Sequence, residues 1–209
     1  MRISVLLTLL ACSVCVLVAA GPTGMAQKAD ESSVASYVAP KGKAVVVLVR
    51  SRALTGSVKF RVIDKKRRCT AMIKGRSHVG MVVKPGKHKF YILAAKRVVK
   101  AERVDAHVTA GRTYIIETRP RAKMKERIDV ETVRRGSDRF SESVHWITGT
   151  KSISSNLAEC TQWVAQKSSK VTAAIASAEQ EWELSGDFYR KARTLSPKDG
   201  RTKKELGDL

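Results

Sequence analysis

Apolar residues alternate with charged residues through much of the middle of the chain. Val58, Phe60 and Val62 are separated by Lys59 and Arg61, which is typical of a strand with one buried face and one face in water. The same period of two recurs at residues 79–83, 90–92, 104–108, 114–116 and 128–130. Residues 44–49 are instead a continuous, mostly β-branched run, which predicts a strand buried on both faces.

Turn residues separate these runs at short intervals, at Gly56, residues 64–66, Gly75, Pro85–Gly86 and Gly111. Short strands with regular turn signals indicate two packed antiparallel sheets. The sequence therefore predicts a mainly β fold, an antiparallel β-sandwich of about seven strands, over residues 43–133.

The apolar spacing changes to three and four residues after about residue 152. The positions that follow this spacing are Ile153, Leu157, Cys160, Val164, Val171, Ile175, Ala178 and Trp182. They predict one amphipathic helix of roughly 30 residues, with a polar gap at Lys167 and Ser168, and a second short helix over residues 188–195. We expect a connector over 134–151, a long C-terminal α-helical extension over 152–196 and a frayed tail over 197–209.

The apolar side of this helix must be buried, because an isolated amphipathic helix draws most of its stability from tertiary packing. It could dock on the sandwich, pair with a second copy or lie on a membrane. Docking is favoured, because small side chains on the apolar side allow a close approach and the acidic end of the helix can meet a basic sandwich. The sequence therefore predicts a monomer in which the following residues face the protein: Ile153, Leu157, Val164, Val171 and Ile175.

Residues 1–26 have the pattern of a secretory signal peptide. Arg2 precedes an apolar run from Ile3 to Ala20, and small residues follow it, so cleavage is expected after Ala20 or Ala26. Residues 27–42 are small and polar, and predict a flexible spacer. An uncleaved anchor or a lipid on Cys12 are alternatives, and all three arrangements export the chain to the periplasm or cell envelope.

The cysteines left after cleavage are Cys69 and Cys160. An oxidising compartment allows a disulfide between them, but each could equally be a small buried residue, and the sequence does not decide between these alternatives. Neither has a second cysteine or histidine at zinc-ligand spacing, so a structural zinc site is not expected.

The positive charge is concentrated in the predicted sandwich. The net charge is +21, and residues 41–135 hold 27 Lys and Arg against 7 Asp and Glu, whereas residues 136–209 hold 11 against 10. Such a surface attracts polyanions. We expect an anionic envelope polymer or another envelope protein as partner, and membrane contact only through an uncleaved or lipidated N-terminus.

The densest basic run is Lys65-Lys66-Arg67-Arg68, which follows a predicted strand. It is either a solvated hairpin tip or an anion-binding tip, and the sequence favours neither. Nucleic acid is disfavoured, because aromatic residues that would stack on bases are missing nearby. Pro85 and Gly86 predict a structural turn, after which His88 packs on the same face as Phe90 and closes the end of the core.

No catalytic or cofactor-binding arrangement is found in the sequence. The four histidines are scattered, and Asp105 and His107 share one face of a strand without a third metal ligand. Signatures of hydrolases, zinc proteases and phosphate-binding loops are missing, so catalytic residues, metal ligands and cofactors are not predicted. Trp182 is expected in a core, whereas Trp163 could still be a carbohydrate platform.

Three segments of residues 43–120 resemble a bacterial family of small exported β-sandwich domains of unknown function (domain of unknown function 2846-like), common in envelope lipoproteins. The matching features are a strand ending in Arg50, the turn Pro85-Gly86-x-His88, and Gly111-x-Thr113-Tyr114. Ser51 and Ile115 depart from the family pattern, in which a proline and a second aromatic residue often stand at these positions. The resemblance implies an architecture and a location, but no site residues.

These observations together predict a non-enzymatic, exported binding or scaffolding module of the cell envelope with a basic surface. The alternative is an envelope hydrolase or carbohydrate-active enzyme with a dispersed site. A pocket holding at least two convergent titratable groups would favour the enzyme.

Overall fold

The computed structural model describes residues 37–52, 58–95, 98–120 and 128–207. The chain divides into two compact units, Met1–Glu31 and Ser32–Leu209, and the described residues all belong to the second. The predicted signal peptide (1–26), Cys12 and most of the spacer lie outside the described residues. Within the described ranges, no helix combines the length and the apolar character needed to cross a bilayer.

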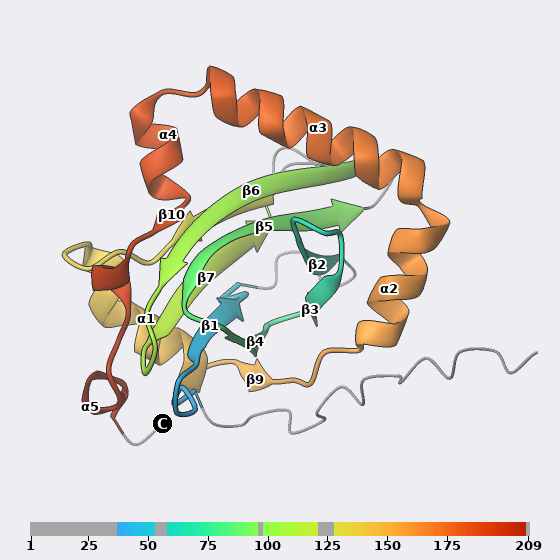
Figure 1. Ribbon diagram of the computed structural model, residues 1–209. Helices are drawn as coiled ribbons and strands as arrows, with labels where there is room; N and C mark the ends of the chain where they lie inside the picture. Colours follow the sequence, from blue (N-terminus) through green and yellow to red (C-terminus); the bar gives the residue numbers. More distant parts are fainter. Residues whose placement is uncertain (1–36, 53–57, 96–97, 121–127, 208–209) are drawn as a thin grey trace, which may run out of the picture. The chain divides into compact units, whose positions relative to one another are not determined.

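The strands form two five-stranded sheets (Figure 1). The first, here called the β1 sheet, has the order β8 (Ile128–Thr132), β7 (Thr113–Pro120), β1 (Ala44–Val49), β4 (Ser77–Val83) and β9 (Lys151–Ser152). The second, here called the β5 sheet, has the order β10 (Thr194–Leu195), β6 (Val99–Val108), β5 (Gly86–Ala95), β2 (Lys59–Asp64) and β3 (Cys69–Lys74). The helices are α1 (Asp138–Thr148), α2 (Leu157–Gln166), α3 (Ser168–Leu184), α4 (Asp187–Ala192), η1 (Pro197–Asp199) and α5 (Lys203–Leu206).

The prediction of a β-rich fold with two packed sheets holds, but the purely antiparallel arrangement of seven strands is wrong. β1 runs parallel to β7, β4 parallel to β9 and β6 parallel to β10. The chain leaves β1 to build other strands in both sheets before it returns in β7 beside β1, and such a return can run in either direction. Alternation of side chains carries no information on strand direction, so the pattern could not show this.

The main core lies between the two sheets. Alternate residues of each long strand point into it, among them Val46, Leu48, Phe60, Phe90 and Val104, all with 1% or less of their surface exposed. The burial of their apolar side chains is the largest stabilising contribution to the fold.

A second cluster covers the outer face of the β1 sheet. Val45, Val47 and Val49 of β1 pack against Ile147 of α1 and Leu206 of α5. All six residues of β1 are buried, so the predicted burial of this strand on both faces is confirmed.

The predicted frayed tail (197–209) is wrong for residues 197–207. Ser196 and Asp199 form one capping box and Thr202 and Glu205 form another, and these reciprocal hydrogen bonds fix the two short helices. Leu206 then has only 3% of its surface exposed. The predicted connector (134–151) likewise contains α1.

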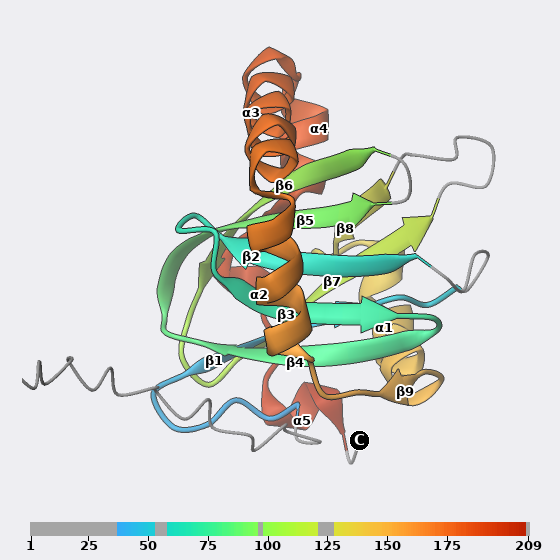
Figure 2. The same cartoon turned by 90° about the vertical axis from the view of Figure 1, so that its right-hand side faces the viewer.

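The outer face of the β5 sheet is covered by α2 and α3, which follow each other along it (Figure 2). Val171, Ala174 and Ala178 are buried against the sheet, with Val164 and Ile175 partly buried beside them. The predicted docking is confirmed for Val164, Val171 and Ile175, and Ile153 packs against the main core instead. Leu157 is half-buried and belongs to none of the core clusters of the described residues. The single helix is not confirmed, because Ser152 belongs to β9 and the helix breaks at Lys167, in the polar gap.

A disulfide and two cation–π contacts hold α2 and α3 on this sheet. A disulfide joins Cys69 of β3 to Cys160 of α2. The Arg61 guanidinium lies 4.1 Å from the ring centroid of Trp163, and Arg103 lies 4.3 Å from that of Trp182.

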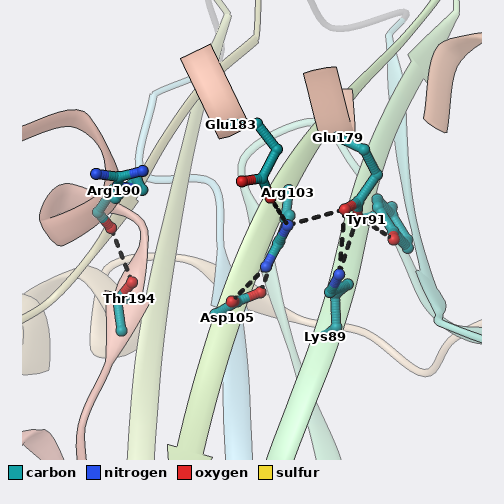
Figure 3. A network of polar contacts seen from close by, with 8 residues as sticks. All are labelled: Lys89, Tyr91, Arg103, Asp105, Glu179, Glu183, Arg190 and Thr194. Carbon is teal, nitrogen blue, oxygen red and sulfur yellow. Dashed lines mark hydrogen bonds and ion pairs between the residues drawn. The ribbon is translucent and has the colours of Figure 1, made fainter. Parts of the chain in front are cut away.

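Carboxylates of the helices complete this attachment. Arg103 Nη1 lies 2.8 Å from Glu179 Oε2, and the carboxylate of Glu179 also accepts hydrogen bonds from Lys89 and Tyr91 (Figure 3). Glu159 pairs with Lys59 at the other end of the helical cover. The expected meeting of acidic helix residues with a basic sandwich is therefore confirmed.

Candidate anion-binding surface

One end of the sandwich collects most of the short connections between strands. The register places the end of β2 beside the start of β5 (Asp64 opposite Phe90), and the end of β4 beside the start of β1 (Val83 opposite Ala44). β6 ends beside the start of β5, and β7 starts beside the start of β1. In Figure 2 this is the end to which β2 points and at which β1 begins.

The C-terminal residues reach the same end. Arg201 pairs with Thr113, the first residue of β7, through two backbone hydrogen bonds of 2.7 and 2.9 Å. We call this end of the sandwich the turn end, and define it as residues 38–43, 64–68, 84–87, 109–112 and 197–205.

The turn end is strongly basic. It contains 13 Lys and Arg but only three acids. Ten of the basic side chains are exposed: Lys41, Lys65, Lys66, Arg67, Arg68, Lys84, Lys87, Lys198, Lys203 and Lys204.

The three acids at the turn end are engaged in local structure and do not neutralise the lysines. Asp64 accepts hydrogen bonds from the backbone N–H groups of Lys66 and Arg68 at 2.8 and 2.9 Å. Asp199 accepts from the backbone N–H groups of Ser196 and Arg135.

Glu205 is the third acid, and it forms an ion pair with Arg135. Arg135 Nη1 lies 2.7 Å from Glu205 Oε1. Hydrogen bonds from Arg135, and from the backbone of Thr202, lower the pKa of Glu205 to about 2. Glu205 is therefore ionised and paired at neutral pH.

The predicted basic tip, Lys65 to Arg68, lies in the turn between β2 and β3. Its four side chains do not share one role. Arg68 pairs with Asp64 at 2.6 Å, and Arg67 donates a hydrogen bond to Thr172 Oγ1 of α3 at 2.8 Å. Lys65 and Lys66 remain exposed without an ion pair, so the lysines present the charge while the arginines fix the turn.

Pro85 lies in the connection from β4 to β5, and Gly86 is the first residue of β5. Gly86 has φ of +125°, a backbone conformation that side-chain-bearing residues rarely adopt. The His88 ring stacks on Phe90 with 5.6 Å between ring centroids, and its Nε2 donates to the Lys84 carbonyl at 2.7 Å. His88 therefore covers the end of the core as predicted, and this short connection sets Lys84 and Lys87 at the turn end.

A shallow hollow of about 590 Å³ opens at the turn end, lined by Thr109, Arg112, Arg135, Pro197, Lys198, Thr202 and Glu205. Arg112 Nη1 donates to the Gly200 carbonyl at 3.0 Å, and Arg135 Nε donates to that of Lys198 at 2.7 Å. The guanidinium groups thus fix the walls, and the hydroxyl groups of Thr109 and Thr202 and the ammonium of Lys198 line an opening wide enough for a phosphate or carboxylate group.

Tyr114 supports the turn end, whereas Arg50 lies after β1 at the opposite end of the sandwich. Tyr114 accepts a hydrogen bond from the Thr109 backbone N–H at 2.9 Å and donates to the Pro197 carbonyl at 3.2 Å. Arg50 is fully buried, with its guanidinium 5.0 Å from the ring centroid of Phe60. Both have structural roles.

The other candidate residues are occupied by structural contacts. Asp105 is held by two hydrogen bonds from Arg103, at 2.9 and 2.8 Å, and His107 lies further along the same strand. One ring face of Trp163 and one of Trp182 are covered by arginine, which leaves Trp163 without the open platform that a sugar needs on that face. In the described part of the chain, no three His, Cys, Asp or Glu residues are grouped as metal ligands.

Sequence reasoning found the Lys65–Arg68 tip and the Pro85–Gly86 turn separately, but not their proximity. It also missed Lys198, Lys203 and Lys204, because their segment was predicted to be frayed. Only the strand register and the pairing of Arg201 with Thr113 bring these residues to one end.

No family model matches the chain, and none of the curated proteins matches it either. The resemblance of residues 43–120 to the exported β-sandwich family stays a prediction.

Proposed function

We propose that this protein is an exported, non-enzymatic module of the cell envelope that binds an anionic polymer through the turn end. In this proposal residues 43–133 are the sandwich module, and the helices of residues 152–196 are an extension added to it. The N-terminal sequence pattern and the disulfide between Cys69 and Cys160 support export, since structural disulfides persist in oxidising compartments.

The observation that carries the proposal is the imbalance of ion pairs. Among the lysines that the structure describes, only Lys59 and Lys89 form ion pairs with carboxylates. Both lie under the helical cover of the β5 sheet, whereas the lysines of the turn end have no acidic partner. Uncompensated lysines on one face of a molecule form a positive field that attracts a polyanion.

A polymer suits this surface better than a small anion. The exposed lysines are spread over four segments and each is a flexible point charge, so the surface offers many weak contacts and no closed cage. Stacking of nucleobases is not supported, because no aromatic residue lines the hollow in the described part of the chain and Tyr114, which bonds to Thr109 and Pro197 of its wall, is fully buried. Phosphate- or carboxylate-bearing envelope polymers match this chemistry.

The enzyme alternative rests on a different place, a groove of about 910 Å³ lined by Glu102, Ser177, Tyr189 and Arg193, among others. It contains convergent titratable groups, which is the feature that favours an enzyme. However, Arg193 Nε and Tyr189 Oη both donate to the same oxygen of Glu102, at 3.1 and 3.0 Å. No histidine or cysteine lines the groove to activate Ser177 or to attack a substrate, so its chemistry favours binding.

The test is binding of polyphosphate and of polyglutamate to the mature protein at about 0.15 M salt, with neutral dextran as a negative control. Replacing Lys65, Lys66, Lys84 and Lys87 together by Gln is expected to weaken binding at least about 10-fold, because contacts with a polyanion add up. The matched control replaces four exposed lysines outside the turn end, Lys74, Lys100, Lys151 and Lys191, and removes the same charge.

Equal losses in the two quadruple variants would show that only net charge matters and would reject the turn end as a site. Failure of the wild type to bind either polymer would reject the proposal of a polyanion binder. N-terminal sequencing tests export separately, since an intact Met1 on the mature protein would contradict cleavage of the signal peptide.

A further inference from the structure

The groove beside Glu102 lies away from the turn end, at the edge where the two sheets face each other. Its walls come from the first half of β6, from β8, and from α3 and α4. We call it the edge groove. It includes Val99, Glu102, Val130, Ala174, Phe188 and Arg193.

One wall of the edge groove is an open strand edge. β6 pairs with β5 along its whole length, but on its other side it pairs only with β10, at Asp105 and Ala106. The Asp105 N–H donates to the Arg193 carbonyl at 3.1 Å. Because backbone groups alternate along a strand, the N–H and C=O groups of Val99, Ala101 and Arg103 point to the same side, and no described strand pairs with them.

The segment from Ala192 to Leu195 covers the edge of β6 only after Arg103, where β10 pairs with Asp105 and Ala106. The Thr132 hydroxyl on β8 lies 3.1 and 3.2 Å from the carbonyl oxygens of Ala192 and Thr194, and so ties this segment to the opposite sheet. The chain then continues to η1. This segment therefore bridges the two sheets beside Asp105 and Ala106. No described strand pairs with the edge of β6 before these residues.

The edge groove also presents a carboxylate. Glu102 has the same orientation along β6 as the core residues Val104 and Ala106, so it points between the sheets. Tyr189 and Arg193 both donate hydrogen bonds to Oε2 of Glu102. Among the described residues, no group contacts Oε1. Glu181 also lines the groove, without an ion pair to any described residue.

An exposed aromatic side chain stands at the rim of the groove. Phe188 has 86% of its surface exposed, and Leu184 nearby has 79%. Of these two, only Phe188 lines the groove. Val98 also lines the groove with 47% of its surface exposed, and exposed apolar surface around a groove marks an interaction site.

We propose that the edge groove binds an extended polypeptide strand that pairs with β6 over Val99–Arg103. The bound strand places an apolar side chain against Phe188 and a lysine or arginine near Oε1 of Glu102. Strand addition to an open sheet edge takes its affinity from main-chain hydrogen bonds and its specificity from alternate side chains. A cationic side chain fits because four acids and three bases line this groove on a protein whose net charge is +21.

A lipid chain would also fit the apolar walls, but it would leave the backbone groups of β6 and the carboxylate of Glu102 without a partner. The peptide is therefore the occupant that the polar groups favour. This site shares no residue with the turn end, so its test is independent of the proposed function.

The experiment uses the mature wild-type protein and a fluorescein-labelled peptide of sequence VTVKVTV, with binding followed by fluorescence anisotropy. Saturable binding below about 1 mM is expected. VPVKVPV, whose prolines prevent strand pairing, and VTVEVTV, whose charge is reversed at the centre, should each bind at least about 5-fold more weakly.

Two matched variants test the position of the peptide. Phe188→Ala should weaken VTVKVTV binding at least about 5-fold, whereas Leu184→Ala, which removes an equally exposed apolar side chain outside the groove, should change it less than about 2-fold. Neither variant should lower the unfolding midpoint, because both side chains are largely exposed. In amide NMR spectra of the protein, the signals of Val99, Ala101 and Arg103 should shift on addition of the peptide.

Several results would overturn the proposal. These are no binding of VTVKVTV, equal binding of VPVKVPV, equal effects of the two alanine variants, or unchanged amide signals on β6. Binding of dodecylphosphocholine below its micellar concentration, seen as shifts of the β6 amide signals without any binding of VTVKVTV, would identify a lipid site in place of a peptide site.

Discussion

The two outer faces of the sandwich are covered in different ways. Over the β1 sheet, Ile147 of α1 and Leu206 of α5 are almost fully buried against valines of β1. Arg139 of α1 adds ion pairs to Glu117 and Glu131 of the sheet. Over the β5 sheet most of the buried helix residues are small, such as Val171, Ala174 and Ala178, and Trp182 is the large exception. Small side chains remove less apolar area from water, so the second cover needs other contacts.

Those contacts are the disulfide, the two arginines stacked on tryptophan and the carboxylates that bind Lys59, Lys89 and Arg103. Each of them depends on solution conditions in a way that apolar burial does not. The comparison teaches that the β5-sheet cover, which holds the disulfide, is sensitive to redox state as well as to ionic strength. The β1-sheet cover combines apolar packing with the ion pairs of Arg139.

The largest expected effect comes from loss of the disulfide. Cys69 and Cys160 are 91 residues apart in sequence, and removal of a native disulfide that closes a long loop typically costs about 2–5 kcal/mol. We expect the Cys69→Ala, Cys160→Ala double variant to lose free energy of unfolding in this range, as measured by urea denaturation under non-reducing conditions.

Hydrogen exchange locates this loss. Protection of amides in α2 and α3 should fall first, while α1 keeps its protection. The reduced wild type is the control, since it should resemble the double variant. An equal loss of protection in α1 and α3 would show that the two covers unfold together and would contradict the comparison.

The sequence predicted those parts of the fold in which side-chain period reflects burial. Alternating runs such as Val58 to Val62 became strands, and the valine run of β1 became a strand covered on both sides. The apolar side of the predicted helix docked on the β5 sheet because it had no other surface to bury it.

β3 escaped prediction for the same physical reason. Met72 lies on the side of β3 that α2 covers, whereas Ala71 and Ile73 point into the main core. Burial on both faces erases the alternation, and the basic run before Cys69 made the segment resemble a turn. The structured tail was readable, because Ser196-x-x-Asp199 and Thr202-x-x-Glu205 are capping-box sequences.

The candidate sites were harder to predict than the fold. Lys65 follows β2 of the β5 sheet, and Lys84 follows β4 of the β1 sheet. Only the strand register places both at the same end of the sandwich. The open edge of β6 depends on where β10 stops pairing. Neither feature has a local sequence signal.

A smaller effect is expected from the ion-pair network of the β5-sheet cover. Glu179→Gln removes the charge that Lys89 and Arg103 share, and Arg103 has only 10% of its side chain exposed. We expect a loss of about 1–3 kcal/mol in free energy of unfolding, because a partly buried hydrogen-bonded charge loses one partner. Asp105 still holds the guanidinium, which keeps the loss within that range.

Glu181→Gln is the matched control, because Glu181 lies on the same helix but forms no ion pair with any described residue. Its effect should stay within about 0.5 kcal/mol. The difference between the two variants should shrink at about 1 M salt, where charges are screened. A difference that does not depend on salt would assign the Glu179 contribution to packing.

The smallest effect concerns the one buried histidine of the β1-sheet cover, His78, which is 2% exposed. The Thr150 hydroxyl donates to the Trp146 carbonyl at 2.7 Å, so it accepts a hydrogen bond from Nδ1 of His78 at 2.6 Å. Nε2 of His78 then accepts a hydrogen bond from the Tyr37 hydroxyl. The neutral ring is therefore satisfied at both nitrogens, and burial lowers the pKa of His78 below its usual value.

The sign of the pH dependence follows from this lowered pKa. As pH falls through about 6.5, the unfolded chain takes up the proton before the folded protein does. The stabilising contribution of His78 is thus complete above about pH 6.5 and is lost as the pH falls toward its folded pKa, by at most about 1.4 kcal/mol per pH unit.

Urea denaturation at about pH 7.5 and about pH 5.5 should show this loss in the wild type. His78→Gln should be less stable at the higher pH but should show a smaller difference between the two. An unchanged difference would place the titrating group elsewhere and would contradict a contribution of His78 to the acid sensitivity of this part of the protein.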